Sequence, residues 1–213
     1  NQEYSLAEDY CNELIHIAKK NNTKILIDAE YDSIQYFINN YSTQAMKNHN
    51  KDQAWVYKTY QMYRKDSFEI LTNDFLRRHS KNEYYLGIKL VRGAYLNEDR
   101  KHNIIFNTKA ETDYNYNQGV EYVSINSLEK DQFILATHNK YSIEKSLYLK
   151  EKNKINNISY SQLLGMSDNL SSSLVEQNQT VYKYLPFGNL KDSIPYLSRR
   201  LYENYAILRY LND

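Results

Sequence analysis

Lys24-Ile-Leu-Ile-Asp28 is a short apolar run bounded by two charged residues. Three consecutive apolar residues are too few for a helix, and the run lacks the polar alternation of a strand with one face in water. A continuous apolar run of this kind is typical of strands in parallel sheets, which are covered on both faces. We therefore expect residues 24–28 to form a buried parallel strand, with Asp28 at its carboxyl end.

Similar apolar runs recur along the chain, and helical patterns separate them. The expected strands are 24–28, 55–61, 84–91, 132–136, 158–164 and 180–185. The expected helices are 5–20, 33–47, 66–78, 113–128, 142–151, 168–176 and a last one from 193. The polar segment 97–113 gives no clear signal for either kind of element.

The first helix carries two local signals. Ser5 and Glu8 have the spacing of a capping box, which indicates a helix start at Ser5. The apolar residues that share one side of this helix are Leu6, Tyr10, Leu14 and Ile17.

A strand followed by a helix, repeated about six times, indicates parallel strands joined by crossover helices. A closed (β/α)8 barrel has eight such units in about 250 residues. The alternative is a doubly wound open sheet, which normally has a glycine-rich phosphate loop after its first strand. No such loop follows Asp28. We therefore predict an α/β fold of the (β/α)8 TIM-barrel type that lacks its first two strands, with residues 1–213 as a single partial barrel domain.

The composition narrows the function classes. The formal net charge is +1, so nothing favours a nucleic acid as partner. The five histidines show no ligand spacing, and we expect no metal site. A single cysteine, Cys11, leaves no intrachain disulfide and fits a reducing compartment. No apolar run approaches the roughly 20 residues of a membrane span. Because the first residue is Asn1 rather than Met, we expect a processed form or a fragment.

Polar side chains gather where the expected strands end. In a barrel of this type, the catalytic groups come from the carboxyl ends of the strands. Asp28 alone is equally compatible with a helix cap, and His138 alone with an ordinary loop histidine, but their joint placement at strand ends indicates a site. The strand ends are Asp28, Gln61, Arg92-Gly-Ala-Tyr95, Thr137-His138-Asn139, Leu163 to Met166, and Tyr184.

The expected last helix has an unusual polar face. Tyr196, Arg199, Arg200 and Glu203 are spaced i, i+3, i+4 and i+7, so they share one side. An arginine side chain binds a carboxylate through two parallel hydrogen bonds, and the pattern therefore favours a site for a small carboxylate. The alternative is a solvated surface helix with an Arg–Glu pair.

Several kinds of chemistry lack their motifs. The sequence has no Ser or Cys nucleophile elbow, which argues against hydrolysis. It also has neither a P-loop nor a dinucleotide glycine fingerprint. A bound cofactor that performs the chemistry, while the protein supplies binding and electrostatics, fits better.

The motifs at these positions strongly resemble those of proline dehydrogenases. They occur in the family's order across nearly the whole chain, and the Thr-Tyr-Gln-Met-Tyr run that starts at Thr59 resembles the eukaryotic, mitochondrial branch. The motifs are Ile27-Asp-Ala-Glu30, Thr59-Tyr-Gln61, Lys89-Leu-Val-Arg-Gly-Ala-Tyr95, Thr137-His-Asn139, Gln162-Leu-Leu-Gly-Met166, Tyr184-Leu-Pro-Phe-Gly188 and Tyr196-Leu-Ser-Arg-Arg-Leu-Tyr-Glu-Asn204.

The resemblance implies a distorted (β/α)8 barrel that holds FAD non-covalently. It implies oxidation of L-proline to Δ1-pyrroline-5-carboxylate, with the electrons passed to a membrane quinone. It also implies a mitochondrial location, in the matrix or at the inner membrane, with peripheral association with that membrane.

The resemblance further assigns roles to residues. Asp28 and Lys89 are predicted as catalytic, with Lys89 beside the flavin and Asp28 orienting the arginines. The predicted cofactor-binding residues are Ala29, Gln61, Val91, Arg92, Gly93, Ala94, Thr137 and His138. The predicted substrate-binding residues are Tyr95, Leu163, Tyr184, Tyr196, Arg199, Arg200 and Glu203.

Two departures from the family pattern bear on function. The family has a lysine on an earlier strand that contacts substrate and flavin, and no counterpart precedes Asp28. Lys89 stands where bacterial members often have arginine, so the charge is kept without the two-pronged geometry. Two alternatives therefore remain: a truncated, non-catalytic barrel remnant or binding module, and a hydroxyproline dehydrogenase. Tyr196 bears on the second, because its bulk is expected to crowd a ring hydroxyl.

Overall fold

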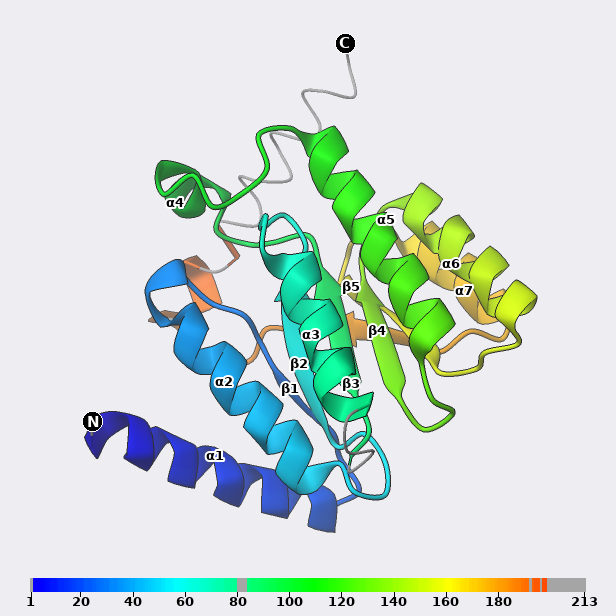
Figure 1. The fold of residues 1–213 in the computed structure, drawn as a ribbon. Helices are drawn as coiled ribbons and strands as arrows, with labels where there is room; N and C mark the ends of the chain where they lie inside the picture. Colours follow the sequence, from blue (N-terminus) through cyan, green and yellow to red (C-terminus); the bar gives the residue numbers. More distant parts are fainter. Residues whose placement is uncertain (1, 80–83, 192, 196, 199–213) are drawn as a thin grey trace.

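The computed structural model describes residues 2–79, 84–191, 193–195 and 197–198. Six strands form one sheet in the order β1-β2-β3-β4-β5-β6, and each neighbouring pair is parallel. The sheet curls into a half-barrel with β1 and β6 at its two edges (Figure 1). The strands are β1 (Ile25–Ile27), β2 (Val56–Gln61), β3 (Gly87–Val91), β4 (Gln132–Ala136), β5 (Ile158–Leu163) and β6 (Val181–Tyr184).

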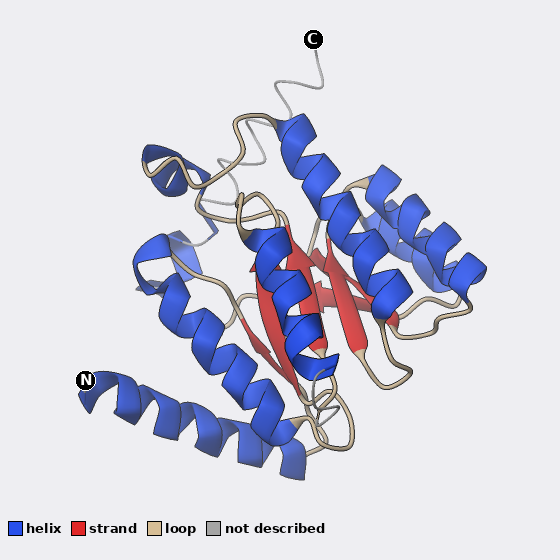
Figure 2. Cartoon of the chain, in the orientation of Figure 1, coloured by secondary structure: helices blue, strands red, loops and turns tan. Residues whose placement is uncertain are grey.

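The long helices that join successive strands lie on the outer face of this half-barrel (Figure 2). Because the strand order follows the chain, every right-handed crossover moves the chain in the same direction and places its helix on the same face. A doubly wound sheet reverses direction and covers both faces, so that alternative is excluded. The helices are α1 (Gln2–Lys20), α2 (Asp32–His49), α3 (Ser67–His79), α4 (Leu96–Lys101), α5 (Lys109–Asn126), α6 (Lys140–Asn153) and α7 (Asp168–Glu176).

The main core lies between the strands and the helices. Successive side chains of a strand point to opposite faces, so every second residue faces the helices. Those residues are almost fully buried, and they include Val56, Ile88, Leu90, Leu135 and Tyr160. The helices contribute Leu71, Phe75, Val120 and Ile143 to the same cluster.

The inner face of the sheet carries a different set of side chains. Thr59 pairs with Lys89, and Ile27 pairs with Lys58, so Asp28, Thr59 and Lys89 form one row across three strands. Ile134 of β4 pairs with Lys89 and continues this row. Tyr57 lies one layer nearer the amino end of β2, and it clusters with Ile134 and Ala54. A Cβ at Gly87 would lie 2.3 Å from the Val56 carbonyl oxygen and 3.0 Å from the Tyr57 ring, so glycine is required for this packing.

The expectation that residues 24–28 are buried on both faces is wrong. β1 covers only Ile25–Ile27, and Leu26 on its inner face is 38% exposed. Among the described residues β1 pairs with β2 alone, so it is an edge strand. The apolar run indicated the strand correctly, but it does not reveal whether a neighbour lies beside it.

The first helix also differs from the expectation. α1 begins at Gln2, so Ser5 lies inside the helix and does not cap it. Ile15 and Ala18 are its buried residues. The predicted apolar side faces solvent, with Leu6, Tyr10, Leu14 and Ile17 each more than half exposed.

Other boundaries shift by local chemistry. α5 begins at Lys109 rather than at Asp113, because Thr108 and Glu111 form a capping box. α6 is capped by Asn139, whose side chain accepts a hydrogen bond from the Ser142 amide, and it therefore starts before Ser142. The segment that gave no clear signal contains the short α4 and the start of α5.

The expected last helix is described in part. Residues 190–191, 193–195 and 197–198 are helical, so the helix starts a little before residue 193. The predicted substrate-binding residues Tyr196, Arg199, Arg200 and Glu203 lie outside the described residues.

Candidate functional site

A pocket of about 490 Å³ opens on the inner face of the half-barrel, at the carboxyl ends of the strands. All five strand ends from β1 to β5, together with Tyr184 of β6, contribute to its wall. The lining residues are Asp28, Ala29, Glu30, Thr59, Gln61, Lys89, Val91, Arg92, Gly93, Ala94, Tyr95, Ala136, Thr137, His138, Ser161, Gln162, Leu163, Met166 and Tyr184.

An ion pair spans one side of this pocket. The Lys89 Nζ donates to the Asp28 Oδ1 at 2.5 Å, and the Thr59 hydroxyl donates to the same oxygen at 3.4 Å. The Lys89 Nζ also lies 5.7 Å from the centroid of the Tyr184 ring. The lysine side chain is 10% exposed and the aspartate 47%, so the pair presents its carboxylate to the pocket mouth.

A second cation in the pocket wall, Arg92, directly follows β3. The Arg92 guanidinium donates to the Asp113 Oδ1 at 2.7 Å, to the Thr137 hydroxyl at 2.7 Å and to the Ser142 hydroxyl at 3.0 Å. Its centre lies 4.3 Å from the centroid of the Tyr116 ring. Residues at the end of β4 and on α5 and α6 therefore fix the plane of this guanidinium. Their bonds engage three of its five N–H groups, which leaves two without a partner in the described part of the chain.

The loop after β4 brings Thr137 into contact with Arg92 and His138 into contact with β5. The Leu163 amide donates to the His138 Nε2 at 3.2 Å, so the ring proton resides on Nδ1. Burial, and then the charge of Lys183, lower the pKa of His138, which favours the neutral ring. The pairing of β4 with β5 ends at Ala136 and Ser161. Beyond that pair, the amide of Leu163 on β5 donates to the His138 ring instead of to a backbone carbonyl of β4.

The third part of the wall is formed by Gln61, Glu30 and Tyr95. The Gln61 amide donates to the Glu30 carbonyl at 3.1 Å, and the Ala94 amide donates to the Gln61 Oε1 at 3.4 Å. The Tyr95 hydroxyl donates to the Glu30 carboxylate at 2.5 Å, and its ring packs 4.0 Å from the centroid of the Tyr31 ring. These contacts join the loop after β1 to the loop after β3.

All predicted site residues within the described part of the chain line this one pocket. They are Asp28, Ala29, Gln61, Lys89, Val91, Arg92, Gly93, Ala94, Tyr95, Thr137, His138, Leu163 and Tyr184. The four predicted residues of the last helix, Tyr196, Arg199, Arg200 and Glu203, lie outside the described residues. The geometry brings the side chains together; their individual roles stay predictions.

Sequence reasoning missed three residues that shape the pocket. Glu30 lies two residues beyond Asp28, a spacing that places both on one side of an extended chain. Thr59 belongs to the Thr59-Tyr-Gln61 motif, but it is not among the predicted site residues. It pairs with Lys89 in the sheet. Asp113 sits in the polar segment that gave no signal, and nothing in the sequence connects it to Arg92.

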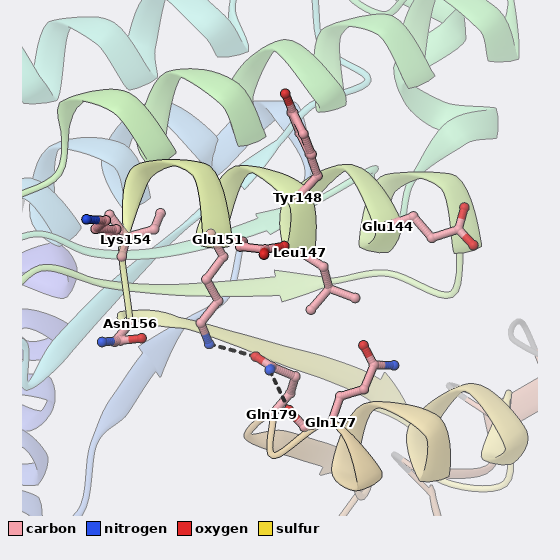
Figure 3. A pocket seen from close by; sticks show the side chains of 10 residues that line it. Glu144, Leu147, Tyr148, Glu151, Lys154, Asn156, Gln177 and Gln179 are labelled. Atoms are coloured by element: carbon pink, nitrogen blue, oxygen red, sulfur yellow. Dashed lines mark hydrogen bonds between the residues drawn. The ribbon is translucent and has the colours of Figure 1, made fainter.

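A larger hollow, of about 700 Å³, lies on the outside of the molecule between α6 and α7 (Figure 3). Lys150 spans it, and its Nζ donates to the Gln179 Oε1 at 2.6 Å. Its wall is built from α6 and from the segments that follow α6 and α7, and it mixes polar, charged and apolar side chains. It contains none of the residues that line the pocket at the strand ends. We therefore place the candidate site in the smaller pocket at the strand ends.

Two kinds of feature are absent from the described residues. No group of three or more His, Cys, Asp or Glu side chains is arranged to hold a metal ion there. No helix in the same residues combines the length and apolar character needed to cross a bilayer.

Known proteins resemble this chain in sequence and in fold. CarD, a carbapenem antibiotics biosynthesis protein of Pectobacterium carotovorum subsp. carotovorum, is 34% identical over 194 residues, which cover 90% of this chain and 51% of that protein. Proline dehydrogenase 1, mitochondrial, of Dictyostelium discoideum is 32% identical over 211 residues, which cover 92% of this chain and 37% of that protein. The proline utilization A (PutA) protein of Bdellovibrio bacteriovorus inactivated by N-propargylglycine superposes with a TM-score of 0.87 at 21% identity, over 95% of this chain and 22% of that one.

The structural likeness shows a shared fold, and the identity is too low for it to show more. The chain spans about half or less of the length of the two curated relatives. The match to the family described as proline dehydrogenase extends over residues 6–213. This protein therefore belongs to the proline dehydrogenase family.

Proposed function

We propose that this chain carries the flavin and substrate site of an enzyme that oxidises L-proline to Δ1-pyrroline-5-carboxylate with FAD. The observation that carries the proposal is the pocket at the strand ends, where the Lys89–Asp28 pair and the Arg92, Thr137 and His138 group meet. These residues belong to the motifs by which the chain resembles its family.

The pocket fits a flavin nucleotide by its chemistry. Its volume lies within the range of about 300–1,000 Å³ found for ligand sites. Ala29, Val91, Ala94 and Leu163 offer an apolar wall for a planar ring. Gly93 has a φ of +150°, and its backbone approaches the pocket without a side chain. No cysteine lines the described pocket, and the His138 Nε2 is already engaged, which supports non-covalent binding.

Within this proposal the polar residues divide into two groups. Gln61 and Lys89 would hold the ring of the cofactor. Arg92, Thr137 and His138 would hold its phosphate side, through N–H and O–H donors that suit phosphate oxygens. His138 would act as a neutral Nδ1–H donor, because its Nε2 accepts from the Leu163 amide.

A bound flavin supplies the hydride acceptor, and the protein supplies alignment and charge. In this oxidation a hydride would leave the proline Cδ and a proton would leave the ring nitrogen for the solvent, so that a C=N bond forms. A protonated amine has no lone pair for this bond, and the rate is therefore expected to rise with pH as the amine is deprotonated. Lys89 fixes a positive charge in the wall, where it stabilises negative charge that develops during the reaction. Asp28 holds that ammonium in place.

We assign the proline carboxylate to Arg199 and Arg200. Tyr95, Leu163, Tyr184 and Tyr196 would surround the pyrrolidine ring. Asp28 and Glu203 would orient the two guanidiniums. The support is the spacing of these residues in the sequence and the position of Tyr95, Leu163 and Tyr184 in the pocket wall.

We also propose that two further β/α units complete a (β/α)8 barrel. Within the described residues, β1 and β6 each pair with one neighbour, which leaves unpaired N–H and C=O groups along two edges. A right-handed crossover places α1 over both β1 and the strand that precedes it. A strand beside β1 would therefore cover Leu26 and the exposed apolar side of α1.

The electron acceptor and the cellular location are proposed by analogy with the relatives. We propose that a membrane quinone reoxidises the cofactor and that the enzyme acts in the mitochondrion, in the matrix or peripherally associated with the inner membrane. The support is the Dictyostelium relative, which is named as a mitochondrial proline dehydrogenase. A tagged full-length protein found outside mitochondria would refute the location.

The decisive experiment is the visible spectrum of the purified full-length protein, with and without L-proline. We expect a flavin absorption band that bleaches on anaerobic addition of proline and returns with a quinone. A protein that retains no flavin would favour the truncated, non-catalytic remnant. Bleaching by hydroxyproline but not by proline would favour the hydroxyproline alternative, which otherwise has no support in the described residues.

A further inference from the structure

Tyr63, which follows β2, lies directly behind the loop formed by residues 92–95. A Cβ at Gly93 would lie 2.5 Å from three atoms of the Tyr63 ring, so the loop backbone rests on the ring itself. Backbone hydrogen bonds fix Tyr63 in turn, because its amide donates to the Arg92 carbonyl at 2.7 Å and its carbonyl accepts from the Phe106 amide at 2.9 Å. Tyr63 does not line the pocket, but Gly93 and Tyr95 do.

The Tyr63 hydroxyl makes two hydrogen bonds of opposite direction. It donates to the Asp99 Oδ2 at 2.5 Å, and it accepts from the Tyr95 amide at 3.3 Å. Tyr63 is 3% exposed and Asp99 is 1% exposed, so water does not compete for either bond. Burial, and then the hydrogen bond to Asp99, raise the pKa of Tyr63, so the hydroxyl keeps its proton.

The bond to Asp99 fixes the orientation of the Tyr63 hydroxyl. Asp99 accepts the hydroxyl proton, and this leaves the lone pairs of the oxygen for the Tyr95 amide. The Tyr95 hydroxyl is meanwhile held by Glu30. Tyr95 is thus fixed at both ends, by Tyr63 at its backbone and by Glu30 at its side chain.

We propose that Tyr63, oriented by Asp99, is a positioning residue that sets the conformation of the loop 92–95 and thereby the wall that Tyr95 presents to substrate. This inference rests on the proposed function for its kinetic consequence. Its structural core, the hydrogen bond from the Tyr95 amide to Tyr63, does not depend on that function.

The chain offers a closely matched control in Tyr60. Its hydroxyl also donates to a buried carboxylate, the Asp74 Oδ2, at 2.7 Å, and the residue is likewise 3% exposed. Tyr60 belongs to the outer face of β2, however, and its hydroxyl bonds to Asp74 on α3 rather than to the loop 92–95. Tyr63→Phe and Tyr60→Phe therefore each remove one tyrosine–carboxylate hydrogen bond, and only the first also removes an acceptor from the loop.

The first measurement is amide hydrogen exchange in the full-length, flavin-loaded protein. In Tyr63→Phe, the Tyr95 amide is expected to exchange about five- to tenfold faster, the effect of losing one buried hydrogen bond. In Tyr60→Phe, the exchange of that amide is expected to equal that of the wild type. Equal exchange at Tyr95 in the wild type and Tyr63→Phe would overturn the proposal.

The second measurement is the steady-state oxidation of proline. Tyr63→Phe is expected to raise KM about tenfold and to change kcat by less than about threefold, because the displaced wall weakens binding in the ground and transition states alike. Asp99→Ala is expected to reproduce this effect, whereas Asp99→Asn, which keeps an acceptor, restores KM to within about threefold of the wild type. Tyr60→Phe is expected to lower the melting temperature without a change in KM.

The outcomes separate the two proposals. A rise in KM of the same size in Tyr60→Phe would attribute the effect to lost stability and would refute the positioning role. Should Tyr63→Phe fail to fold, Asp99→Ala and Asp99→Asn answer the same question, and equal KM values for the two would count against the role. Flavin that stays oxidised with proline in the wild type would refute the proposed function, while amide exchange would still decide whether Tyr63 holds the loop.

Discussion

The ammonium of Lys89 on β3 lies 2.5 Å from the carboxylate of Asp28 at the end of β1, although β2 separates the two strands. The register explains the contact, because Thr59 of β2 occupies the same row and donates to Asp28 as well. A long lysine side chain is able to cross one strand, and a shorter cation would not reach. The pair therefore links the first and third strand ends on the inner face.

This geometry predicts the effect of removing the charge. Lys89→Met is expected to lower kcat/KM for proline by about 10²-fold, the cost typical of removing one preorganised electrostatic group from an active site. Lys89→Arg is expected to retain most activity, because it keeps the charge and has the length to reach Asp28. The reduction of the flavin by proline, followed in a stopped-flow instrument, measures the effect on the chemical step.

Lys130→Met is the control for this series. Lys130 lies over the Tyr85 ring with a separation of 5.5 Å, much as Lys89 lies over Tyr184, but it does not line the pocket. Its loss is expected to leave kcat/KM unchanged. An equal loss of activity in both variants would show that Lys89 acts through general stability.

The sequence was sufficient to predict the strand ends, and the reason is physical. Parallel strands with crossover helices bring all carboxyl ends to one edge, so residues far apart in the chain meet there whatever the details of the helices. The ranges 132–136 and 168–176 agree with β4 and α7 to the residue. The convergence of Asp28, Lys89 and His138 needed only the order of the elements.

The sequence did not reveal contacts that depend on side-chain packing between elements. Tyr63 and Asp99 meet across a separation of 36 residues, and no spacing rule connects them. Asp113 reaches Arg92 only because the capping box of Thr108 and Glu111 starts α5 one turn early. The burial of β1 was predicted wrongly for a related reason. Hydrophobicity indicates that a side chain is stabilised by burial, but its exposure depends on whether another element packs against it.

Among the described residues, two histidines have lowered pKa values, and they predict a loss of stability in acid. Burial lowers the pKa of His138, helped by Lys183, and burial lowers that of His49, helped by His16 and Lys19. In the unfolded chain each titrates near about 6.5. The unfolded state therefore binds more protons in the window below about pH 6.5, and the free energy of unfolding falls as the pH drops through that window towards the lower folded pKa.

The measurement is the melting temperature between pH 8 and pH 5, compared with variants. His138→Gln and His49→Gln are each expected to flatten the acid side of the profile, and the double variant more than either. His102→Gln, at an exposed position on the surface, is the control and is expected to follow the wild type. A wild-type slope retained in the double variant would assign the acid sensitivity to carboxylates.

The buried pair of Arg78 and Asp131 predicts a large effect on stability. Both side chains are fully buried, and the Asp131 carboxylate also accepts the Leu86 and Leu128 amides at 2.7 Å each. Arg78→Met leaves this carboxylate without its charged partner, and it is expected to lower the free energy of unfolding by about 3–5 kcal/mol. Urea unfolding at constant pH measures the change.

The comparison for this prediction is the surface pair of Lys101 and Glu98. It has a separation of 3.1 Å, but both side chains are more than half exposed. Lys101→Met is expected to change the free energy of unfolding by less than about 1 kcal/mol. Similar effects of Arg78→Met and Lys101→Met would contradict the importance of burial for the Arg78 pair.

Asp113 provides a last prediction, because it acts on the pocket from outside it. Burial alone would raise the pKa of Asp113, but hydrogen bonds from Lys109 and Arg92 outweigh it and the pKa is lowered, so the carboxylate is charged at neutral pH. It holds the Arg92 Nε at 2.7 Å, while Thr137 and Ser142 hold the other two nitrogens. Asp113→Ala removes the hydrogen bond that holds the Arg92 Nε. It is expected to weaken flavin binding by about tenfold, the effect of losing one charge-assisted hydrogen bond.

Flavin fluorescence during titration of the apoprotein measures this affinity. Asp113→Asn, which keeps a hydrogen-bond acceptor for the Arg92 Nε–H, is expected to recover part of it. Lys109→Met is the matched control, because Lys109 contacts the same carboxylate from the solvent side and its side chain is 76% exposed. Within the described residues, Asp113 is joined to the pocket wall through its bond to Arg92. Lys109→Met is therefore expected to leave the affinity unchanged. Equal weakening in Asp113→Ala and Lys109→Met would mean that the local charge around Asp113, rather than the orientation of Arg92, determines the affinity for the cofactor.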